Sequence, residues 1–407
     1  MEHADVAVVG AGAAGLMAAT WCGRTHPGRR IVVLEGARSL GAKILVAGGG
    51  RCNVTHDTVS EADFSGSSPP AIRNVLRRFD VERTVEFFRE LGVELKREDT
   101  GKLFPVTDRA RTILDALLRS TREAGAEVRF PRRVESLRRS DEAFELSGAW
   151  GSIRASAVIL CAGGSALPKS GSDGAGHVMA KALGHSVTPL VVPALVPLVL
   201  DASARLRELP GVACEAVVEV RSGSGKRLAR FRDALLCTHF GVSGPAILDV
   251  SRHLTHARAA DSEASLFVSW LPGETPESVD RELLALGKGT PARFLSRRMP
   301  ERLARMLCEM AGGDPHAPAS AWTRAQRRAL AGLVTEMPLP VAGDRGWTHA
   351  EVTAGGVPLS EIRLQTMESR LCPRAYLAGE VLDVDGRIGG YNFQWAWASG
   401  HVAGVSA

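Results

Sequence analysis

Three consecutive glycines, Gly48–Gly50, run directly into Arg51, Cys52 and Asn53. A glycine loses more conformational freedom on folding than any other residue, so a run of three indicates a backbone with a special task. The arginine that follows can neutralise a phosphate or another anion, and the asparagine amide can donate and accept hydrogen bonds. The stretch therefore indicates ligand binding, and the other motifs limit the class of ligand that it could bind.

The start of the chain carries a dinucleotide-binding pattern. The apolar run ADVAVV (4–9) predicts a buried parallel strand, and GAGAAG (10–15) follows it and opens an apolar helix. The first glycine permits the tight turn, the second lets the backbone approach a pyrophosphate, and the third lets helix and strand pack closely. A second strand, IVVL (31–34), ends in Glu35, whose carboxylate can accept both hydroxyls of an adenosine ribose. At this point FAD and NAD both remain open.

The end of the chain returns to the same kind of site. AYLAGE (375–380) predicts another buried strand, and Gly389 and Gly390 precede an apolar stretch that predicts a buried helix. Bare N–H groups at such a helix N-terminus can face the part of a flavin that becomes negative on reduction. Glu380 and Asp383 have the character to accept ribityl hydroxyls. A third strand, VILCAGG (158–164), also ends in a glycine pair and leads out to another domain.

The motifs together resemble the BaiN/aminoacetone-oxidase-type (YhiN-like) flavoproteins of the two-dinucleotide-binding superfamily. The matching stretches, which span nearly the whole chain, are GAGAAG at 10–15, KILVAGGGRCN at 43–53, AGGSALPKSGSDGAGH at 162–177, THFGVSGPAILDVS at 238–251 and GEVLDVDGRIGGYNFQWAWASG at 379–400. The resemblance implies a FAD domain carrying an inserted β-barrel and a small helical domain.

Carried over position by position, the resemblance and the motifs give one set of expected FAD contacts. They are Gly10, Gly12, Ala13, Ala14, Gly15, Glu35, Lys43, Gly49, Gly50, Arg51, Cys52, Asn53, Ala162, Gly163, Gly164, Gly379, Glu380, Asp383, Gly389, Gly390, Tyr391 and Asn392. Our hypothesis for the glycine triplet is that its backbone lies against the flavin ring system or the pyrophosphate, too close for any Cβ. Lys43 and Arg51 would then neutralise phosphate or a reduced-flavin anion.

Three residues are candidates for proton transfer or nucleophilic chemistry. His239, in the turn CTHFGVSGP, could protonate a substrate while the flavin passes hydride. A histidine that only holds the loop together explains the same position equally well. We interpret Cys52 as a small packing residue, with a reactive catalytic thiol as the alternative. Tyr391 is a further candidate proton donor.

We predict an α/β fold in three parts. A discontinuous Rossmann-like FAD-binding domain covers 1–186 and 346–407, and a β-barrel-like domain covers 187–274, completed by strands near 335–355. A small helical domain covers 275–334, with Thr290-Pro291, Pro300 and the run RAQRRALAGLV as helix signals.

Composition bounds the location and the partners. The seven cysteines lack paired spacing, which favours reduced thiols in a cytoplasm, and no metal-binding motif occurs, so we expect no metal. No stretch reads as membrane-spanning, and the acidic start argues against export. Residues 281–330 hold ten basic residues against four acids, a local charge of +6 in a chain of net charge +5. That segment is a candidate surface for ribosomal RNA, and a solvated helical face is the simpler alternative. The oligomeric state is left open.

The leading functional prediction is a FAD-dependent oxidoreductase that uses NAD(P)H to reduce a C=C next to a carbonyl in a small-molecule substrate. The alternatives, in order, are reduction of a 23S rRNA uridine to dihydrouridine, oxidation of an aminoacetone-type amine, and flavin binding without turnover.

Overall fold

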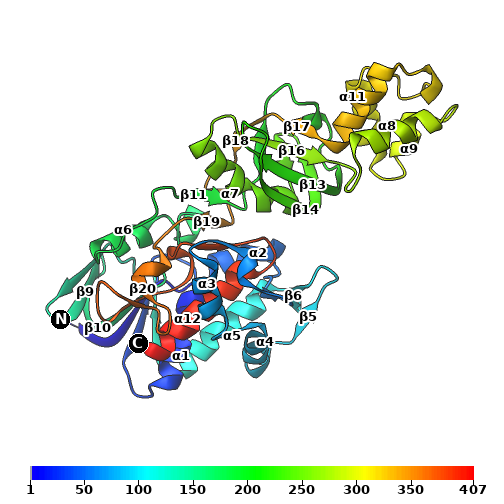
Figure 1. Cartoon of the computed structure of the whole chain (residues 1–407). Helices are drawn as coiled ribbons and strands as arrows, with labels where there is room; N and C mark the ends of the chain where they lie inside the picture. The colour runs from blue at the N-terminus through cyan, green and yellow to red at the C-terminus, as the bar shows by residue number, and fades with distance from the viewer. Residues whose placement is uncertain (1) are drawn as a thin grey trace. The chain divides into compact units, whose positions relative to one another are not determined.

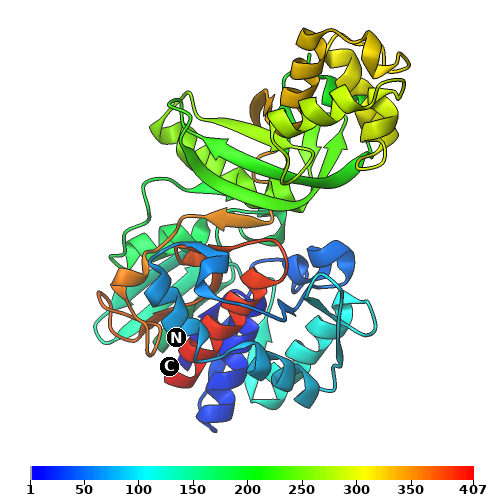
Figure 2. The same ribbon diagram turned by 45° about the vertical axis from the view of Figure 1, so that its right-hand side comes forward.

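A computed structural model describes residues 2–407 and divides the chain into two compact units. Unit 1 consists of Met1–Pro193 and Glu351–Ala407, and unit 2 consists of Ala194–Ala350. In Figures 1 and 2 the blue and red ends of the chain therefore share one unit, and the green-to-yellow middle forms the other. The chain leaves unit 1 and returns to it. The proposed division of the middle into a barrel and a helical domain stays a prediction, because both parts lie in one compact unit.

A parallel sheet with the strand order of a Rossmann-like fold forms the centre of unit 1. Its path is β20-β21-β22-β10-β1-β2-β7, and β22, β10, β1, β2 and β7 are mutually parallel. The first strand, β1 (Glu2–Val9), lies between β2 (Ile31–Leu34) and β10 (Gly151–Leu160). The strand order reverses at β1, and ligands of open α/β sheets bind beyond the carboxyl ends of the strands at such a point. The strands predicted in the stretches 4–9, 31–34, 158–164 and 375–380 are all present, and the last two end earlier than predicted, at Leu160 and Leu377.

The bounds of the other elements of unit 1, including the remaining strands of this sheet, are as follows. Its other strands are β3 (Thr55–His56), β4 (Phe64–Gly66), β5 (Leu95–Arg97), β6 (Lys102–Pro105), β7 (Ala126–Arg129), β8 (Ser136–Ser140), β9 (Ala143–Gly148), β19 (Val352–Ala354), β20 (Ile362–Arg363), β21 (Glu368–Ser369), β22 (Ala375–Leu377) and β23 (Val384–Gly386). Its helices are α1 (Ala13–Thr25), α2 (Ala42–Gly50), α3 (Pro69–Leu76), α4 (Val81–Glu90), α5 (Ala110–Glu123), α6 (Ala175–Ala182) and α12 (Tyr391–Ser406). β11 (Val192–Ala194) lies where the chain passes to unit 2.

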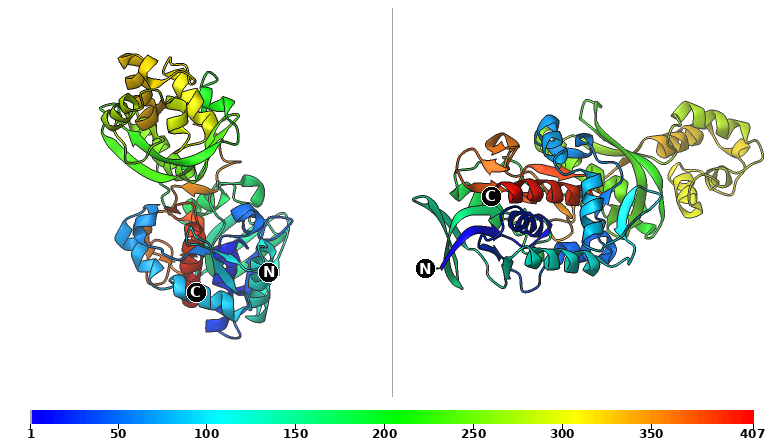
Figure 3. Two further views of the ribbon diagram at one scale, coloured as in Figure 1. Left: turned by 90° about the vertical axis from the view of Figure 1, so that its right-hand side faces the viewer. Right: turned by 90° about the horizontal axis from the view of Figure 1, so that it is seen from below.

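The first and last helices pack directly against each other. Figure 3 shows α1 and α12 side by side in the view from below. A Cβ on Gly400 would lie 2.6 Å from the Ala14 carbonyl oxygen, and one on Gly404 would lie 2.3 Å from that of Ala18. Glycine is therefore required on α12 at both positions, because the two helix backbones approach too closely for a side chain.

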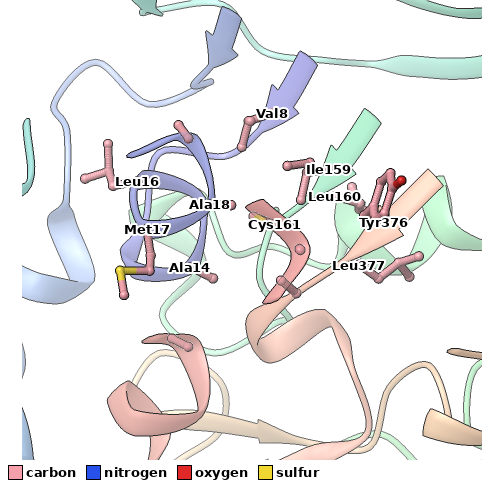
Figure 4. Packing of buried hydrophobic residues seen from close by; sticks show 14 of the residues in the cluster. Val8, Ala14, Leu16, Met17, Ala18, Ile159, Leu160, Cys161, Tyr376 and Leu377 are labelled. Carbon is pink, nitrogen blue, oxygen red and sulfur yellow. The ribbon is translucent and has the colours of Figure 1, made fainter. Parts of the chain in front are cut away.

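The core beneath these helices is apolar and contains side chains from distant parts of the sequence. Figure 4 shows Val8 of β1, Ile159 of β10 and Leu377 of β22 beside residues of α1. Val8, Ile159 and Leu377 are fully buried. Burial of this kind contributes about 25 cal/mol per Å² of apolar surface removed from water, so the core fixes the two ends of the chain in one unit.

Unit 2 contains a seven-stranded antiparallel sheet in the order β17-β16-β13-β14-β15-β12-β18. The two end strands, β17 (Met337–Leu339) and β18 (Val341–Asp344), are joined by Pro340 alone, so the two ends of the sheet must come close together. The inner strands are β12 (Leu198–Leu200), β13 (Ala213–Arg221), β14 (Arg227–Thr238), β15 (Gly241–Ser243) and β16 (Ser265–Ser269).

The helices of unit 2 match the sequence signals in part. Thr290 caps α9 (Pro291–Leu295), Pro300 precedes α10 (Glu301–Met310), and RAQRRALAGLV falls in α11 (Arg324–Thr335), all as predicted. Two helices were not predicted, namely α7 (Pro245–Ala260) and α8 (Pro276–Ala285). Both begin with a proline at the first helical position, which is the signal that could have located them.

Within residues 2–407 no group of three or more His, Cys, Asp or Glu side chains could hold a metal ion, and all seven cysteines are free. None of the helices in this range has the length and apolar character needed to cross a membrane.

Candidate functional site

The glycine-rich turn after β1 is built by close backbone contacts. A Cβ on Gly10 would lie 2.5 Å from the Cys161 carbonyl oxygen, and one on Gly15 would lie 1.9 Å from the Gly10 oxygen. Gly12 differs, because a Cβ there would meet nothing within 4 Å. Gly12 is also the N-cap residue of α1, and no side chain caps the first N–H groups of this helix. Such a helix end is suited to an anion.

Glu35 is tied to this turn. One carboxylate oxygen accepts a hydrogen bond from the Ala11 N–H at 2.8 Å, and the other accepts one from the Ala37 N–H at 2.8 Å. These bonds fix the end of β2 against the GAGAAG turn. Each carboxylate oxygen keeps a further lone pair, so the predicted ribose contact is compatible with the geometry and stays a prediction.

The glycine triplet owes its residue type to backbone conformation. Gly48, Gly49 and Gly50 have φ of 57°, 69° and 84°, all in the left-handed region where only glycine is unstrained. A Cβ on Gly49 would meet nothing within 4 Å, and the nearest atom to one on Gly50 is 3.8 Å away. Crowding by the protein is thus not the reason for glycine at 49 and 50. The open space beside Gly49 is compatible with the hypothesis that a ligand approaches this backbone closely. The left-handed backbone alone, however, explains why glycine occupies these positions.

Two buried polar atoms beside these loops lack a partner. Asn53 is 8% exposed and Ser172 is 5% exposed, yet the Asn53 Oδ1 and Ser172 Oγ atoms make no hydrogen bond. A Cβ on Gly163 would lie 2.8 Å from this Oγ, so Ser172 adjoins the predicted Gly163-Gly164 contact. Leaving such an atom unsatisfied costs about 1–3 kcal/mol. A ligand with polar groups would satisfy both atoms. Ser172 was not among the expected FAD contacts, and it lies just before α6, whose N-cap is Gly174.

Lys43, Glu380 and Thr353 form a connected polar network. The Lys43 ammonium pairs with Oε2 of Glu380, and Oε1 accepts from the Thr353 N–H at 3.0 Å and from its hydroxyl at 2.8 Å. The Thr353 hydroxyl oxygen in turn accepts from the N–H groups of Ser165 at 2.7 Å and Ala166 at 3.1 Å. The network joins the α2 loop, the loop after β10 and the segment after β22. Thr353 was missed by sequence reasoning, although the glycine pair Gly355-Gly356 that follows it is the kind of signal that could have found it.

The start of α12 is held by contacts with neighbouring residues of unit 1. Gly390 has φ of 97°, and a Cβ there would lie 2.7 Å from the Thr55 backbone. The Asn392 amide bonds both backbone groups of Gly386, at 2.8 and 2.9 Å. Tyr391 is buried and stacks on His56, with ring centroids 5.0 Å apart. Asn392 therefore holds β23 (Val384–Gly386), and its predicted FAD contact stays a prediction.

Three more expected contacts lie within unit 1 as follows. Gly379 has φ of 77°, and a Cβ there would lie 2.8 Å from the Ala14 Cβ, so it adjoins the first turn of α1. The Asp383 carboxylate accepts from the Ser67 hydroxyl at 3.4 Å. Arg51 is turned toward acidic residues: it pairs with Glu98 at 2.6 Å, and its Cζ lies 4.0 Å from the Phe104 ring centroid. The pair engages Nη1 of Arg51, and its predicted FAD contact stays a prediction.

The structure separates the three catalytic candidates. Cys52 is fully buried, and burial raises the pKa of its thiol to about 12, so it stays protonated near neutral pH. This favours the packing role and argues against the nucleophile, because the thiolate is the reactive form. His239 is exposed in the β14–β15 turn of unit 2. Tyr391 lies in unit 1 at the first position of α12, and its role as proton donor stays a prediction.

Known proteins resemble the chain over its whole length. A family model described as "HI0933-like protein Rossmann domain" matches residues 4–406. The chain is 33% identical to a 3-dehydro-bile acid delta(4,6)-reductase of Clostridium scindens, covering 99% of this chain and 98% of that protein. It is 31% identical to a ribosomal RNA dihydrouridine synthase of Escherichia coli, covering 98% and 96%.

A solved structure supports the fold alone. The 3-ketosteroid delta1-dehydrogenase of Sterolibacterium denitrificans superposes with a TM-score of 0.53 at 13% identity, covering 99% of both chains. The predicted family resemblance is confirmed by the family model and the two full-length relatives. The chain is an oxidoreductase of the flavoprotein type, as predicted. It belongs to the HI0933-like family of Rossmann-domain proteins.

Proposed function

We propose that this protein is a FAD-dependent reductase that uses NAD(P)H to saturate a C=C conjugated to a carbonyl in a small, steroid-like substrate. The observation that carries the reaction class is the full-length similarity, at 33% identity, to a bile acid reductase. The cofactor is supported by the residues of unit 1 themselves.

The residues present fit FAD in four respects. The space beside Gly12 and the open first turn of α1 suit a pyrophosphate. Glu35 keeps acceptor capacity at the end of β2, where the adenosine ribose binds in such folds. The unpartnered Asn53 Oδ1 and Ser172 Oγ atoms offer a buried acceptor and a hydroxyl to polar groups of a ligand. The glycine-lined start of α12 offers N–H donors for a group that gains negative charge.

When bound, a flavin supplies hydride transfer between the nicotinamide and the substrate. The chain's own residues hold and position it. The pair with Glu380 holds the Lys43 ammonium in place, and Thr353 donates to the other oxygen of that carboxylate. Protonation of the substrate requires a donor, and Tyr391 and His239 are the two residues we propose to test for it.

The experiment is an anaerobic reduction of the FAD-loaded protein. We expect NADH or NADPH to bleach the flavin absorbance and a 3-oxo-4-ene steroid to restore it, with the saturated ketone as product. Bleaching by an amine but not by NAD(P)H would support the oxidase alternative instead. A protein that binds no FAD after reconstitution would contradict the proposal altogether.

A second candidate, uridine reduction in ribosomal RNA, is favoured by one specific observation. Among residues 281–330, eight exposed basic residues make no ion pair in the described chain: Arg281, Lys288, Arg293, Arg297, Arg302, Arg305, Arg324 and Arg328. Unpaired cations of this kind can contact phosphates. Arg298 and Arg327 do not belong to this set, because they pair with Glu274, Glu282 and Asp280.

Base stacking finds less support there. Trp322 is buried, and Phe294 lies under the Arg298 guanidinium at 5.0 Å, so neither ring offers a free face for a base. Mass spectrometry of 23S rRNA from a deletion strain decides the matter. Loss of one dihydrouridine, restored by the wild-type gene but not by a variant with Arg297, Arg324 and Arg328 changed to Glu, would establish the RNA substrate. Unchanged rRNA would exclude it.

A further inference from the structure

Two arginines of unit 2 meet at one two-residue turn. The turn between β14 and β15 consists of His239 and Phe240, and it packs on the short strand β12 through a hydrogen bond from the Leu200 N–H to the Phe240 carbonyl at 3.1 Å. Arg345 follows β18 on the other side of β12. The Arg345 side chain reaches the same turn across the short strand β12.

Arg345 is held in place without a carboxylate. Its Cζ lies 4.3 Å from the Phe240 ring centroid, a cation–π contact, and its Nη2 donates to Nε2 of His349 at 2.8 Å. Since this Nε2 accepts, the proton of His349 resides on Nδ1, which lies 3.1 Å from the Arg345 carbonyl oxygen. His349 orients the guanidinium without supplying a carboxylate that would cancel its charge.

Arg207 contacts the same turn, again through neutral groups. Its Nε donates to the His239 carbonyl oxygen at 3.0 Å, and its Nη1 lies 3.5 Å from the Leu200 carbonyl oxygen. Neither Arg207 nor Arg345 has a carboxylate within ion-pair distance among residues 2–407. The carboxylate of Asp344, adjacent in sequence, accepts from the Gly346 N–H at 2.7 Å.

The exposed imidazole of His239 completes the cluster. Its ring lies edge-on to the Phe240 ring, with centroids 5.1 Å apart. Two planar guanidinium groups, fixed by neutral partners and carrying uncompensated charge, match the bidentate geometry of a carboxylate or phosphate. Holding them in advance lowers the ordering cost of binding.

We propose that Arg207, His239 and Arg345 form an oxyanion-binding site on unit 2. Its occupant is a carboxylate or phosphate group of a small organic molecule. The site goes beyond the proposed function, which concerns the cofactor and the C=C bond. If the occupant is the substrate, as the carboxylate side chain of a steroid acid would be, that part of the inference rests on the proposed function.

The test uses the full chain loaded with FAD and two probes, inorganic phosphate and 3-oxochol-4-en-24-oate with its uncharged methyl ester. We follow the His239 ring resonances in protein with isotope-labelled histidine, assigned with H239Q. We expect saturable shifts with phosphate or the steroid acid and none with the ester. R345Q and R207Q should each weaken binding about tenfold or more, because each removes a charge-assisted hydrogen-bonding group.

R324Q is the matched control, since Arg324 is an exposed, unpaired arginine of the same unit, and it should bind as the wild type does. The phosphate titration needs no turnover, so it can be interpreted even if the proposed function fails. Saturation by the steroid acid alone would assign the substrate carboxylate, and saturation by phosphate alone a phosphate-bearing ligand. The proposal is wrong if neither oxyanion shifts His239, if R345Q and R207Q bind like wild type, or if R324Q is equally weakened. Should R345Q not fold, R207Q and the wild-type titration still decide.

Discussion

Replacement of Thr353 by valine tests the polar network that joins three loops of unit 1. The hydroxyl is fully buried and accepts from the N–H groups of Ser165 and Ala166 at 2.7 and 3.1 Å while donating to Glu380 at 2.8 Å. Valine keeps the volume but removes the acceptor, which leaves two N–H donors without a partner. At about 1–3 kcal/mol for each buried unsatisfied group, we expect a loss of about 3 kcal/mol.

The assay is native-state hydrogen exchange measured by mass spectrometry over residues 163–168. A loss of about 3 kcal/mol corresponds to about a hundredfold faster exchange at residues 165 and 166, since about 1.4 kcal/mol changes an equilibrium tenfold. FAD affinity should fall as well, because Glu380 loses one of its donors and Lys43 is held less firmly.

A matched control is Thr188→Val in the same unit. The Thr188 hydroxyl accepts a single N–H, that of Gly356, at 2.9 Å. Its loss should speed exchange near Gly356 by about tenfold and leave residues 165 and 166 unchanged. Exchange at 165 and 166 that stays within about twofold of wild type in Thr353→Val would refute the reasoning, because the two N–H groups would then have no need of this acceptor.

Three further predictions follow from the same unit. Gly15→Ala should fail to fold or to bind FAD, because its Cβ would lie 1.9 Å from the Gly10 oxygen, whereas Gly12→Ala should fold normally and lose only FAD affinity, measured by flavin fluorescence. Cys52 should resist iodoacetamide in the folded protein at pH 8, and rapid labelling before unfolding would contradict this. The pKa of its thiol is about 12 in the folded protein and 9.0 in the unfolded chain. The contribution of the buried thiol to stability is therefore complete below pH 9 and is lost as the pH rises toward 12. Burial lowers the pKa of His401 to about 4, so the neutral ring stabilises the fold above pH 6.5 and up to about 3 kcal/mol is lost as the pH falls through 4. Urea midpoints for wild type and His401→Asn check this, and equal pH profiles for the two would contradict it.

Local sequence patterns were sufficient for the elements whose residues carry their own signal. The strand at IVVL and the helix after GAGAAG were predicted correctly, because continuous apolar runs and glycine spacing depend only on neighbouring residues. The cap at Thr290 was predicted from the Thr-Pro pair for the same reason. The family, and with it the oxidoreductase class, followed from long motifs in a fixed order.

Side-chain partners could not be predicted in the same way. Arg51 was expected to face an anion, but the fold places Glu98 within 2.6 Å of it. Asn392 was expected at the cofactor, but its amide is satisfied by the Gly386 backbone. Tertiary packing brings Glu98 to Arg51 from 47 residues away, whereas Gly386 lies only six residues before Asn392. Both cofactor contacts stay predictions.

The sequence by itself determined that this protein has a Rossmann-type nucleotide-binding turn and a glycine triplet with a special backbone, and it predicts a discontinuous domain. Only the tertiary structure showed that the triplet is left-handed, that Thr353 connects three loops, and that Arg207 and Arg345 meet at His239 and Phe240. The physical reason is the sequence distance over which each kind of interaction acts. Periodicity, capping and turn chemistry act over a few residues, whereas hydrogen bonds and ion pairs between segments more than a hundred residues apart depend on how the sheets bring those segments together.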